Sequence, residues 1–494
     1  MKKIILLSII FICYSLVAKS QSTYNLDLEK SISIAKLKSY NMLKLTQDFK
    51  ISEYNLKSAT SSLKTHITLN LEGPNYAKDV QSYITDSSST YFTSKRLQYG
   101  GNLLIKQPLP TAGYVSIQTG LYNKDTYTLN QRSPNLYTTF NFEQPLTALY
   151  GYNSVKSYLK KAELAYEQSK KALKREELNL IYIVSNSFYG YLSAQKRTEI
   201  AKLDLDRQKD AFDISQNKFK AGLIKEVDAL QMEVDLAEAQ NNFDLAIINQ
   251  SSTQNEFKQL IGINLNDSVL VSGKFTYIPV IVNADKAVQL ALQNRLEIRE
   301  QEIQIEQSKL NVKEQKSNGM IQSSLNLSFG KSGYSYQDLN SSLTNALNNT
   351  YSKYLERSPD YSIGLSVKVP ILDFGENRAK VKAAEAGLKQ NELQKIEVQR
   401  NIEREVRNMV AEMNSSLKRL QLLEKNIIVA EKSFDITRQR FSDGDIDSQG
   451  LALERKRLNT AYTSHLSAYV SYQLYLADLM RKTFYDFQNN QPIK

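Results

Sequence analysis

The chain has 494 residues with a formal net charge of +11, and it contains 9 prolines, 18 glycines, one cysteine and two histidines. So few prolines and glycines indicate long uninterrupted elements, and a modest basic excess argues weakly for anionic surroundings such as lipid headgroups and hardly at all for nucleic acid. One cysteine and two distant histidines, His66 and His465, exclude a disulfide framework and a histidine-built zinc site within one chain.

The N-terminus has the pattern of a secretory signal peptide. Two lysines precede an apolar run at residues 4–18, and small residues at positions 18 and 20 fit cleavage before Gln21. We therefore predict a signal peptide at residues 1–20 and an exported mature chain without cysteine. Cys13 could carry a lipid, but the two residues before it are bulky where small ones would be expected, so we predict that it stays unmodified.

The remaining chain has a repeated plan. Residues 26–66 predict a helix and residues 67–73 a strand, and residues 282–329 repeat both patterns at an offset of 256 (26 onto 282). Further on, Pro145 aligns with Pro370 at an offset of 225, so about 31 extra residues lie in the first half. We predict a tandem duplication, with a first repeat at residues 21–281 and a second at residues 282–494.

The extra residues lie in an insertion at residues 74–144. Segments 97–107 and 113–122 predict two strands joined by the turn PLPTAG, which is an inserted hairpin. This hairpin either adds strands to a sheet or folds as a loop. Two segments rich in Ser, Thr, Asn and Tyr, residues 82–94 and 338–350, predict solvent-facing loops.

Two very long helices are predicted at residues 153–219 and 377–441. Apolar residues follow a heptad seam in both, and roughly 65 residues at about 1.5 Å each give a helix of about 100 Å. Such helices are stable only with partners alongside, because propensity alone leaves the apolar face unburied. Each half therefore predicts one long helical hairpin.

Each hairpin turns at a glycine that follows an aromatic residue by three positions, Phe219 with Gly222 and Phe441 with Gly444. Helix resumes near Glu226 and near Asp447, whose acidic side chains suit a helix N-terminus. Two interpretations of these tips stay open. The glycines serve only the backbone geometry, or the two turns also form a docking surface.

Each long helix begins at a strand-to-helix junction, marked by Pro145 and Gly151 in the first half and by Pro370, Asp373 and Gly375 in the second. The strand before the second junction, residues 361–369, alternates between apolar and polar side chains. Ten of the 30 tyrosines lie at residues 76–152 and five at residues 334–361. A membrane-interface girdle and ordinary β propensity explain this clustering equally well.

The fold class predicted is an α+β membrane protein. Two or four strands from one chain cannot close a membrane barrel, whose edges must all be paired. Three copies of about four strands each, or more if the inserted hairpin contributes, would close one, and the helices would form a second tube below it.

The whole mature chain resembles the TolC family of outer-membrane efflux proteins. The resemblance rests on the exported N-terminus, the duplicated plan, the junction at Pro370, Asp373 and Gly375, the QPLPTAG turn and the two aromatic-x-x-Gly tips. It implies a homotrimer with a β-barrel in the outer membrane and an α-barrel across the periplasm. It also implies a passive exit duct for efflux or type I secretion, engaged by an inner-membrane transporter through a periplasmic adaptor protein.

By this resemblance the helix tips dock the adaptor, through Phe219, Gly222, Leu223, Ile224, Phe441, Gly444, Asp445 and Ile446. Well-studied family members carry acidic residues six and nine positions after the second tip glycine, where this chain has Gly450 and Leu453. The candidate acidic aperture is therefore assigned to Asp228, Asp443, Asp445 and Asp447. The first junction also departs from the pattern, with Ala148 in place of the aspartate.

Other function classes have little support. The triplet DFG at residues 373–375 matches a kinase motif, but no glycine-rich phosphate loop accompanies it, so we predict a turn, no catalytic residue and no enzyme. We expect no cofactor, no metal site and no nucleic-acid partner. One alternative stays open, an exported structural or adhesive coiled-coil protein whose strands form a small cap.

Overall fold

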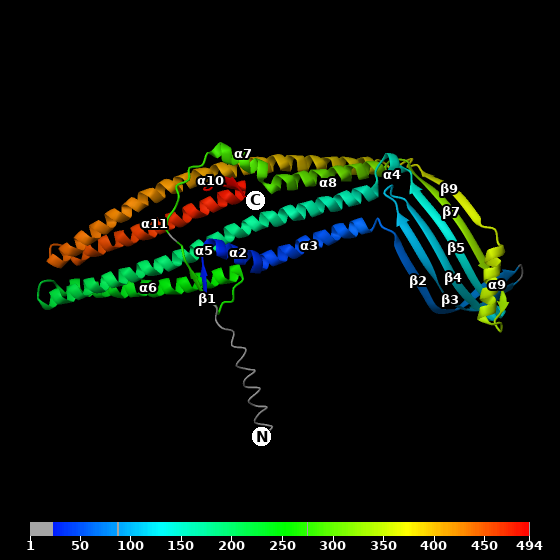
Figure 1. Ribbon diagram of the computed structural model, residues 1–494, viewed down its shortest axis with the longest axis horizontal. Coiled ribbons are helices and arrows are strands. Elements are labelled where there is room, and N and C mark those ends of the chain that lie inside the picture. The colour runs from blue at the N-terminus through cyan, green and yellow to red at the C-terminus, as the bar shows by residue number, and fades with distance from the viewer. Residues whose placement is uncertain (1–22, 86–87, 274, 494) are drawn as a thin grey trace, which may run out of the picture. The chain divides into compact units, whose positions relative to one another are not determined.

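The computed structural model describes residues 23–85, 88–273 and 275–493, so the predicted signal peptide at residues 1–20 and Cys13 lie outside the described residues (Figure 1). The chain divides into two compact units. The first unit comprises Met1–Phe49, Lys170–Glu300 and Lys395–Lys494, and the second comprises Lys50–Ser169 and Gln301–Gln394. Both halves of the sequence contribute to each unit.

The second unit contains one antiparallel sheet, whose long strands lie side by side in Figure 1. Their order is β2 (His66–Thr85), β3 (Ser88–Pro108), β4 (Tyr114–Thr126), β5 (Gln131–Pro145), β7 (Gln322–Tyr334) and β9 (Asp360–Lys368). The two-residue strand β8 (Gln337–Asp338) pairs with β5, and the 3-10 turn η1 (Tyr127–Leu129) joins β4 to β5. The insertion therefore adds strands to the sheet, and the predicted hairpin around PLPTAG is confirmed as β3 and β4.

The sheet has one apolar and one polar face, because side chains alternate along every strand. One row of paired residues crosses all six long strands on the apolar face, and it consists of Ile67, Ile105, Ile117, Phe140, Phe329 and Tyr361. The neighbouring row lies on the other face and consists of His66, Lys106, Ser116, Asn141, Ser328 and Ser362. The alternation predicted for residues 361–369 thus crosses all six long strands in these two rows, whereas farther along β4 and β5 the same face carries the ion pair of Asp125 and Arg132.

Two segments predicted as loops are regular structure. Most of residues 82–94 belongs to β2 and β3, and the predicted strand 67–73 was too short. The second segment is largely α9 (Leu343–Glu356), which begins at Ser342, whose hydroxyl accepts from the Asn345 N–H at 3.2 Å. Both predictions were wrong for the same reason, because one polar face of a strand or helix has the same composition as a loop.

The two longest helices have the predicted extents, α5 (Ser154–Lys220) and α10 (Glu376–Asp443). Each is followed by a shorter helix, α6 (Glu226–Ile261) and α11 (Ser448–Thr483). The helix predicted over residues 26–66 is instead α2 (Leu28–Lys38) and α3 (Tyr40–Ser61), because Ser39 is extended and interrupts it. A similar break at Arg295 separates α7 (Ala284–Asn294) from α8 (Leu296–Asn318).

Short elements complete the chain. Strand β1 (Thr23–Leu26) pairs in parallel with β6 (Ser268–Val271), β10 (Tyr485–Asp486) pairs with β11 (Gln491–Pro492), and α4 (Thr147–Tyr150) is a single turn after β5. Across the described ranges, 23–85, 88–273 and 275–493, no helix combines the length and the apolar character needed to cross a membrane.

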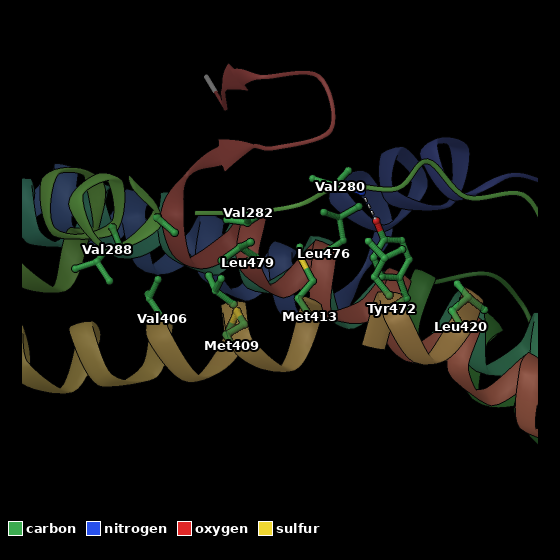
Figure 2. Close-up of a cluster of buried hydrophobic side chains, with 14 of the residues drawn as sticks. Val280, Val282, Val288, Val406, Met409, Met413, Leu420, Tyr472, Leu476 and Leu479 are labelled. Carbon is green, nitrogen blue, oxygen red and sulfur yellow. Dashed lines mark hydrogen bonds between the residues drawn. The ribbon is translucent and has the colours of Figure 1, made fainter. Parts of the chain in front are cut away.

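The apolar core of the first unit lies where α7, α10 and α11 meet the strand-like segment before α7. Figure 2 shows Val282, Met409 and Leu479 packed together, with Met413 and Leu476 between them and Tyr472, whose hydroxyl accepts from the Val280 N–H at 3.0 Å. A second cluster in the same unit surrounds Tyr191, whose hydroxyl donates to the Val269 carbonyl at 3.0 Å. Because both buried tyrosines satisfy backbone groups of extended segments, they fix those segments against the helices.

Candidate functional site

Two helix turns of the first unit, residues 221–225 and 444–447, end the long helices and have the same backbone conformation. Gly222 has a φ of +74° and Gly444 one of +91°. In each turn the glycine N–H bonds to the aromatic carbonyl three residues earlier, and the next N–H bonds to the carbonyl five residues earlier, at 2.8 and 2.9 Å in the first turn and 3.2 and 2.9 Å in the second. This is the Schellman end of a helix, which requires a left-handed residue.

The two aromatic residues before these glycines have different surroundings. Phe441 is 3% exposed and packs with Met232, Phe434 and Leu451, whereas Phe219 is 38% exposed. Lys218 joins the turns, because its ammonium group donates to the Phe441 carbonyl and lies 4.8 Å from the centre of the Phe441 ring. Phe441 therefore anchors the turns to the apolar cluster beneath them, and Phe219 remains available at the surface.

A cavity of about 510 Å³ lies between the two turns. It brings together the four carboxylates of the candidate acidic aperture, Asp228, Asp443, Asp445 and Asp447, but Lys218 and Lys225 also line it. Two of these carboxylates have local hydrogen bonds: Asp447 accepts from the Gly450 N–H at 2.9 Å as the N-cap of α11, and Asp443 accepts from the Gln439 amide at 3.1 Å. The aperture residues are thus adjacent within one chain, in a site of mixed charge.

The remaining predicted docking residues present apolar surface at the turns. Leu223 is 73% exposed, while Ile224 and Ile446 are half-buried on the cavity wall. Asp445 is exposed. The turns therefore offer a small apolar surface surrounded by charges of both signs, which is the composition of a transient protein interface.

The second strand-to-helix junction, in the other unit, is a capped turn. After Pro370, the Asp373 carboxylate accepts from the N–H groups of Asn377 at 3.0 Å and Gly375 at 2.9 Å. These two bonds lower the pKa of Asp373, since they favour its charged form. Gly375 has a φ of +88°, which allows the chain to turn directly before α10. Asp373 caps a helix, and this accounts for the DFG triplet.

The first junction is built differently. Pro145 ends β5, and the single-turn helix α4 separates it from α5. Gly151 has a φ of −118°, so it does not supply the left-handed turn that Gly375 supplies at the second junction. The capping residue is Asn153, whose side-chain oxygen accepts from the Lys156 N–H at 2.9 Å and whose amide donates to the Pro110 carbonyl at 2.9 Å. Sequence reasoning missed Asn153, although an Asn two residues after a glycine at a helix start is a recognisable cap.

An ion-pair belt in the first unit was also missed. Arg175 donates to both carboxylate oxygens of Glu300 at 2.6 Å, and Arg295 pairs with Glu297 and Glu405, each at 2.6 Å. Lys482 pairs with Glu405 at 2.8 Å. These six residues, which we call the ion-pair belt, connect α5, α8, α10 and α11. No local pattern reveals them, because the partners Arg175 and Glu300 are 125 residues apart and Arg295 and Glu405 are 110 apart.

Two belt carboxylates, Glu300 and Glu405, have pKa values shifted in opposite directions. Burial raises the pKa of Glu300, and the nearby Arg175 offsets this only in part. Burial would also raise the pKa of Glu405, but its hydrogen bonds with Lys482 and Arg295 outweigh burial and lower that pKa. The belt therefore holds Glu405 of α10 in its charged form and joins it to Lys482 of α11 and to Arg295, which lies between α7 and α8.

Comparisons with known proteins agree on one family. A model described as outer membrane efflux protein matches residues 114–263 and 287–481. The alkaline protease secretion protein AprF of Pseudomonas aeruginosa is 22% identical over 348 residues, which are 68% of this chain and 69% of AprF. Nodulation protein T of Rhizobium leguminosarum bv. trifolii is 23% identical over 334 residues, which are 67% of this chain and 66% of that protein. The solved Campylobacter jejuni CmeC outer membrane channel matches 94% of this chain and 86% of its own, with a TM-score of 0.68 and 14% identity.

Proposed function

The chain belongs to the outer membrane efflux protein family and is an outer-membrane exit channel for efflux or secretion, and from this premise we propose that three copies form one passive duct. The sheets close a barrel in the outer membrane, and the long helices form a tube that extends into the periplasm. The single observation that carries the proposal is the sheet, whose apolar face is exposed and whose two edge strands lack a second partner within the described chain. Family membership sets aside the alternative of a structural or adhesive coiled-coil protein.

Exposed apolar stripes on the helices of the first unit support the association of several copies. On α10, Leu422, Val429 and Ile436 are each more than half exposed and repeat every seven residues. On α6, exposed Val227 and Val234 repeat at the same spacing. Heptad stripes of this kind pack against partner helices in coiled coils, and neighbouring copies supply such helices in a tube.

The proposed partners at the helix turns are a periplasmic adaptor protein and, through it, an inner-membrane transporter. The surface proposed for the adaptor comprises the first-turn residues Phe219, Gly222, Leu223 and Ile224 and their second-turn counterparts Phe441, Gly444, Asp445 and Ile446. The exposed Leu223 and Phe219 and the mixed charge around them favour such docking. The carboxylates Asp228, Asp443, Asp445 and Asp447 would then surround the aperture of the duct.

The test of the duct is its oligomeric state in the membrane fraction. We expect the protein in detergent extracts of the outer membrane, as a trimer that survives unheated electrophoresis in dodecyl sulfate and dissociates to monomers on boiling. Light scattering of the purified protein checks the mass independently. A water-soluble monomer would contradict the duct.

A further inference from the structure

The inserted strands β3 and β4 carry the same two faces as the rest of the sheet. Ile105 of β3 and Ile117 of β4 pair with each other within the apolar row, and Lys106 and Ser116 pair within the polar row next to it. Ile117 is 44% exposed on the apolar face, as expected of a residue that faces lipid. A hairpin folded away as a surface loop would have no reason to keep lipid-facing and water-facing residues in step with four other strands.

The two edges of the sheet are complementary in direction. In the described chain β2 pairs only with β3, and β9 only with β7. Because all neighbouring strands are antiparallel and the long strands number six, β2 and β9 run in opposite directions. The edge strand β9 of one copy would therefore lie antiparallel to β2 of the next, as every other pair in the sheet does.

Both edges also lack cover. All nine residues of β9 are exposed, and so are Ile67, Leu69 and Leu71 near the start of β2. The exposed apolar surface continues past β9 to Ile371, which is 92% exposed. Lipid cannot satisfy the free N–H and carbonyl groups of an edge strand, so a second copy of this chain is the occupant that matches both the backbone and the apolar face.

We propose that each copy contributes all six long strands to one membrane barrel, with β9 of one copy paired to β2 of the next, so that three copies close a barrel of eighteen strands. The inference rests on the proposed trimeric duct and replaces the twelve strands expected from four per copy. Neighbouring strands about 4.8 Å apart and tilted by about 40° give a circumference of about 113 Å and a diameter of about 36 Å. Twelve strands would give about 24 Å.

The wider barrel changes what can leave the channel. Barrels of sixteen to eighteen strands enclose an aqueous channel, and here the water-facing row is Lys, His, Ser and Asn rather than bulky apolar residues. An α-helix with its side chains is about 10–12 Å wide, so the membrane exit admits a polypeptide as readily as a small compound. The outer-membrane section is therefore a wide polar outlet and does not select cargo by size.

The barrel size is measurable as a distance between equivalent positions in the three copies. Phe140→Cys places a spin label on the apolar face of β5, and Cys13→Ser leaves this as the one cysteine of the chain. Three-fold symmetry gives about 31 Å between backbone positions for eighteen strands and about 21 Å for twelve. A matched variant lacking residues 88–129 joins β2 to β5 and keeps four long strands, and we expect its distance to be about 10 Å shorter.

The outcomes separate this inference from the proposed function. A trimer with the longer distance supports eighteen strands, and a trimer with about 21 Å in the full-length chain overturns them while leaving the duct intact. A monomer by light scattering overturns both. If the shortened variant does not assemble, the full-length distance alone decides between about 31 and about 21 Å.

Crosslinking tests the edge pairing itself. Leu69→Cys combined with Leu365→Cys, and the same pairing scanned over the other apolar-face positions of β2 and β9, should give disulfide-linked dimers and trimers under mild oxidation at one register. Asn70→Cys with Leu365→Cys places the thiols on opposite faces and should give none. Equal crosslinking of same-face and opposite-face cysteine pairs would contradict the proposed pairing of β2 with β9. No crosslinking at any register in an intact trimer would also contradict it.

Discussion

The ion-pair belt and the helix turns belong largely to the same helices, yet they are held in different ways. In the belt, Arg295 and Lys482 are each only 13% exposed and pair with carboxylates from other helices. In the turns, Gly222 and Gly444 contact no atom at the position a side chain would take, and Leu223 is 73% exposed. The belt therefore fixes helix positions, whereas the turns are exposed and can contact a partner.

The two turns also differ from each other. Both have the same glycine-centred backbone, but the first carries Lys220 and Lys225 where the second carries Ser442 and Asp447. The glycine and the aromatic residue thus determine the backbone conformation of both turns, and the charged residues determine how their surfaces differ. In the proposed trimer, a partner would therefore meet turns of two different charge compositions.

The largest effect is expected from breaking the belt at Arg295. Arg295→Ala leaves Glu297 without its pairing partner and Glu405 with only Lys482, so it should lower the free energy of unfolding by about 2–3 kcal/mol. The melting of the helical circular dichroism signal in detergent measures the loss. Arg407→Ala is the matched control, because Arg407 is 47% exposed and solvent screens its pairs with Asp285 and Glu403, so their loss should change the stability little. Equal losses in the two variants would contradict the distinction between belt and surface.

A smaller and local effect is expected at the turns. Gly444→Val meets no neighbour, but it places a β-branched residue at a φ of +91°, which costs about 1–2 kcal/mol or more. The turn should rearrange while the trimer stays assembled, and export measured in cells that depend on this channel should fall. Gly190→Ala is the control, since Gly190 lies in α5 with free space around it and alanine favours a helix. Normal export by Gly444→Val would argue against docking at the turns.

The elements defined by local chemistry could be predicted from the sequence. The heptad seams gave α5 and α10 within a few residues, and the Phe219 and Phe441 patterns located both turns. The strand β9 was visible from the alternation of apolar and polar side chains along it.

What could not be predicted depends on residues that are distant in sequence or on polar faces of regular elements. Helix α9 begins in an Asn- and Ser-rich segment, and its packing rests on Gly333, where an added side chain would strike the Tyr354 backbone. The belt joins residues more than a hundred positions apart. The number of strands was left open because a hairpin turn at residues 109–113 says nothing about which sheet its strands extend.

The smallest effect is a dependence of stability on pH that separates the belt from exposed ion pairs. Burial opposes the charge of Glu405, but its hydrogen bonds with Lys482 and Arg295 lower its pKa below the ordinary 4.5. The stability that charged Glu405 contributes to the folded state is therefore fully present above about pH 4.5 and is lost as the pH falls through the lower pKa of the folded state. Burial raises the pKa of Glu300 despite the nearby Arg175. Glu300 therefore opposes the effect of Glu405 and makes the change of stability with pH smaller.

Glu405→Gln should therefore reduce the fall in melting temperature between about pH 6 and about pH 4, where carboxylates of this kind begin to protonate. The matched control is Glu376→Gln, whose exposed carboxylate pairs only with Lys380 among the described ion pairs and should leave the pH dependence of the wild type unchanged. Parallel curves for Glu405→Gln and the wild type would mean that the belt carboxylate is not held in its charged form by Arg295 and Lys482. The contrast between the belt and the exposed turns would then rest on the difference in burial alone.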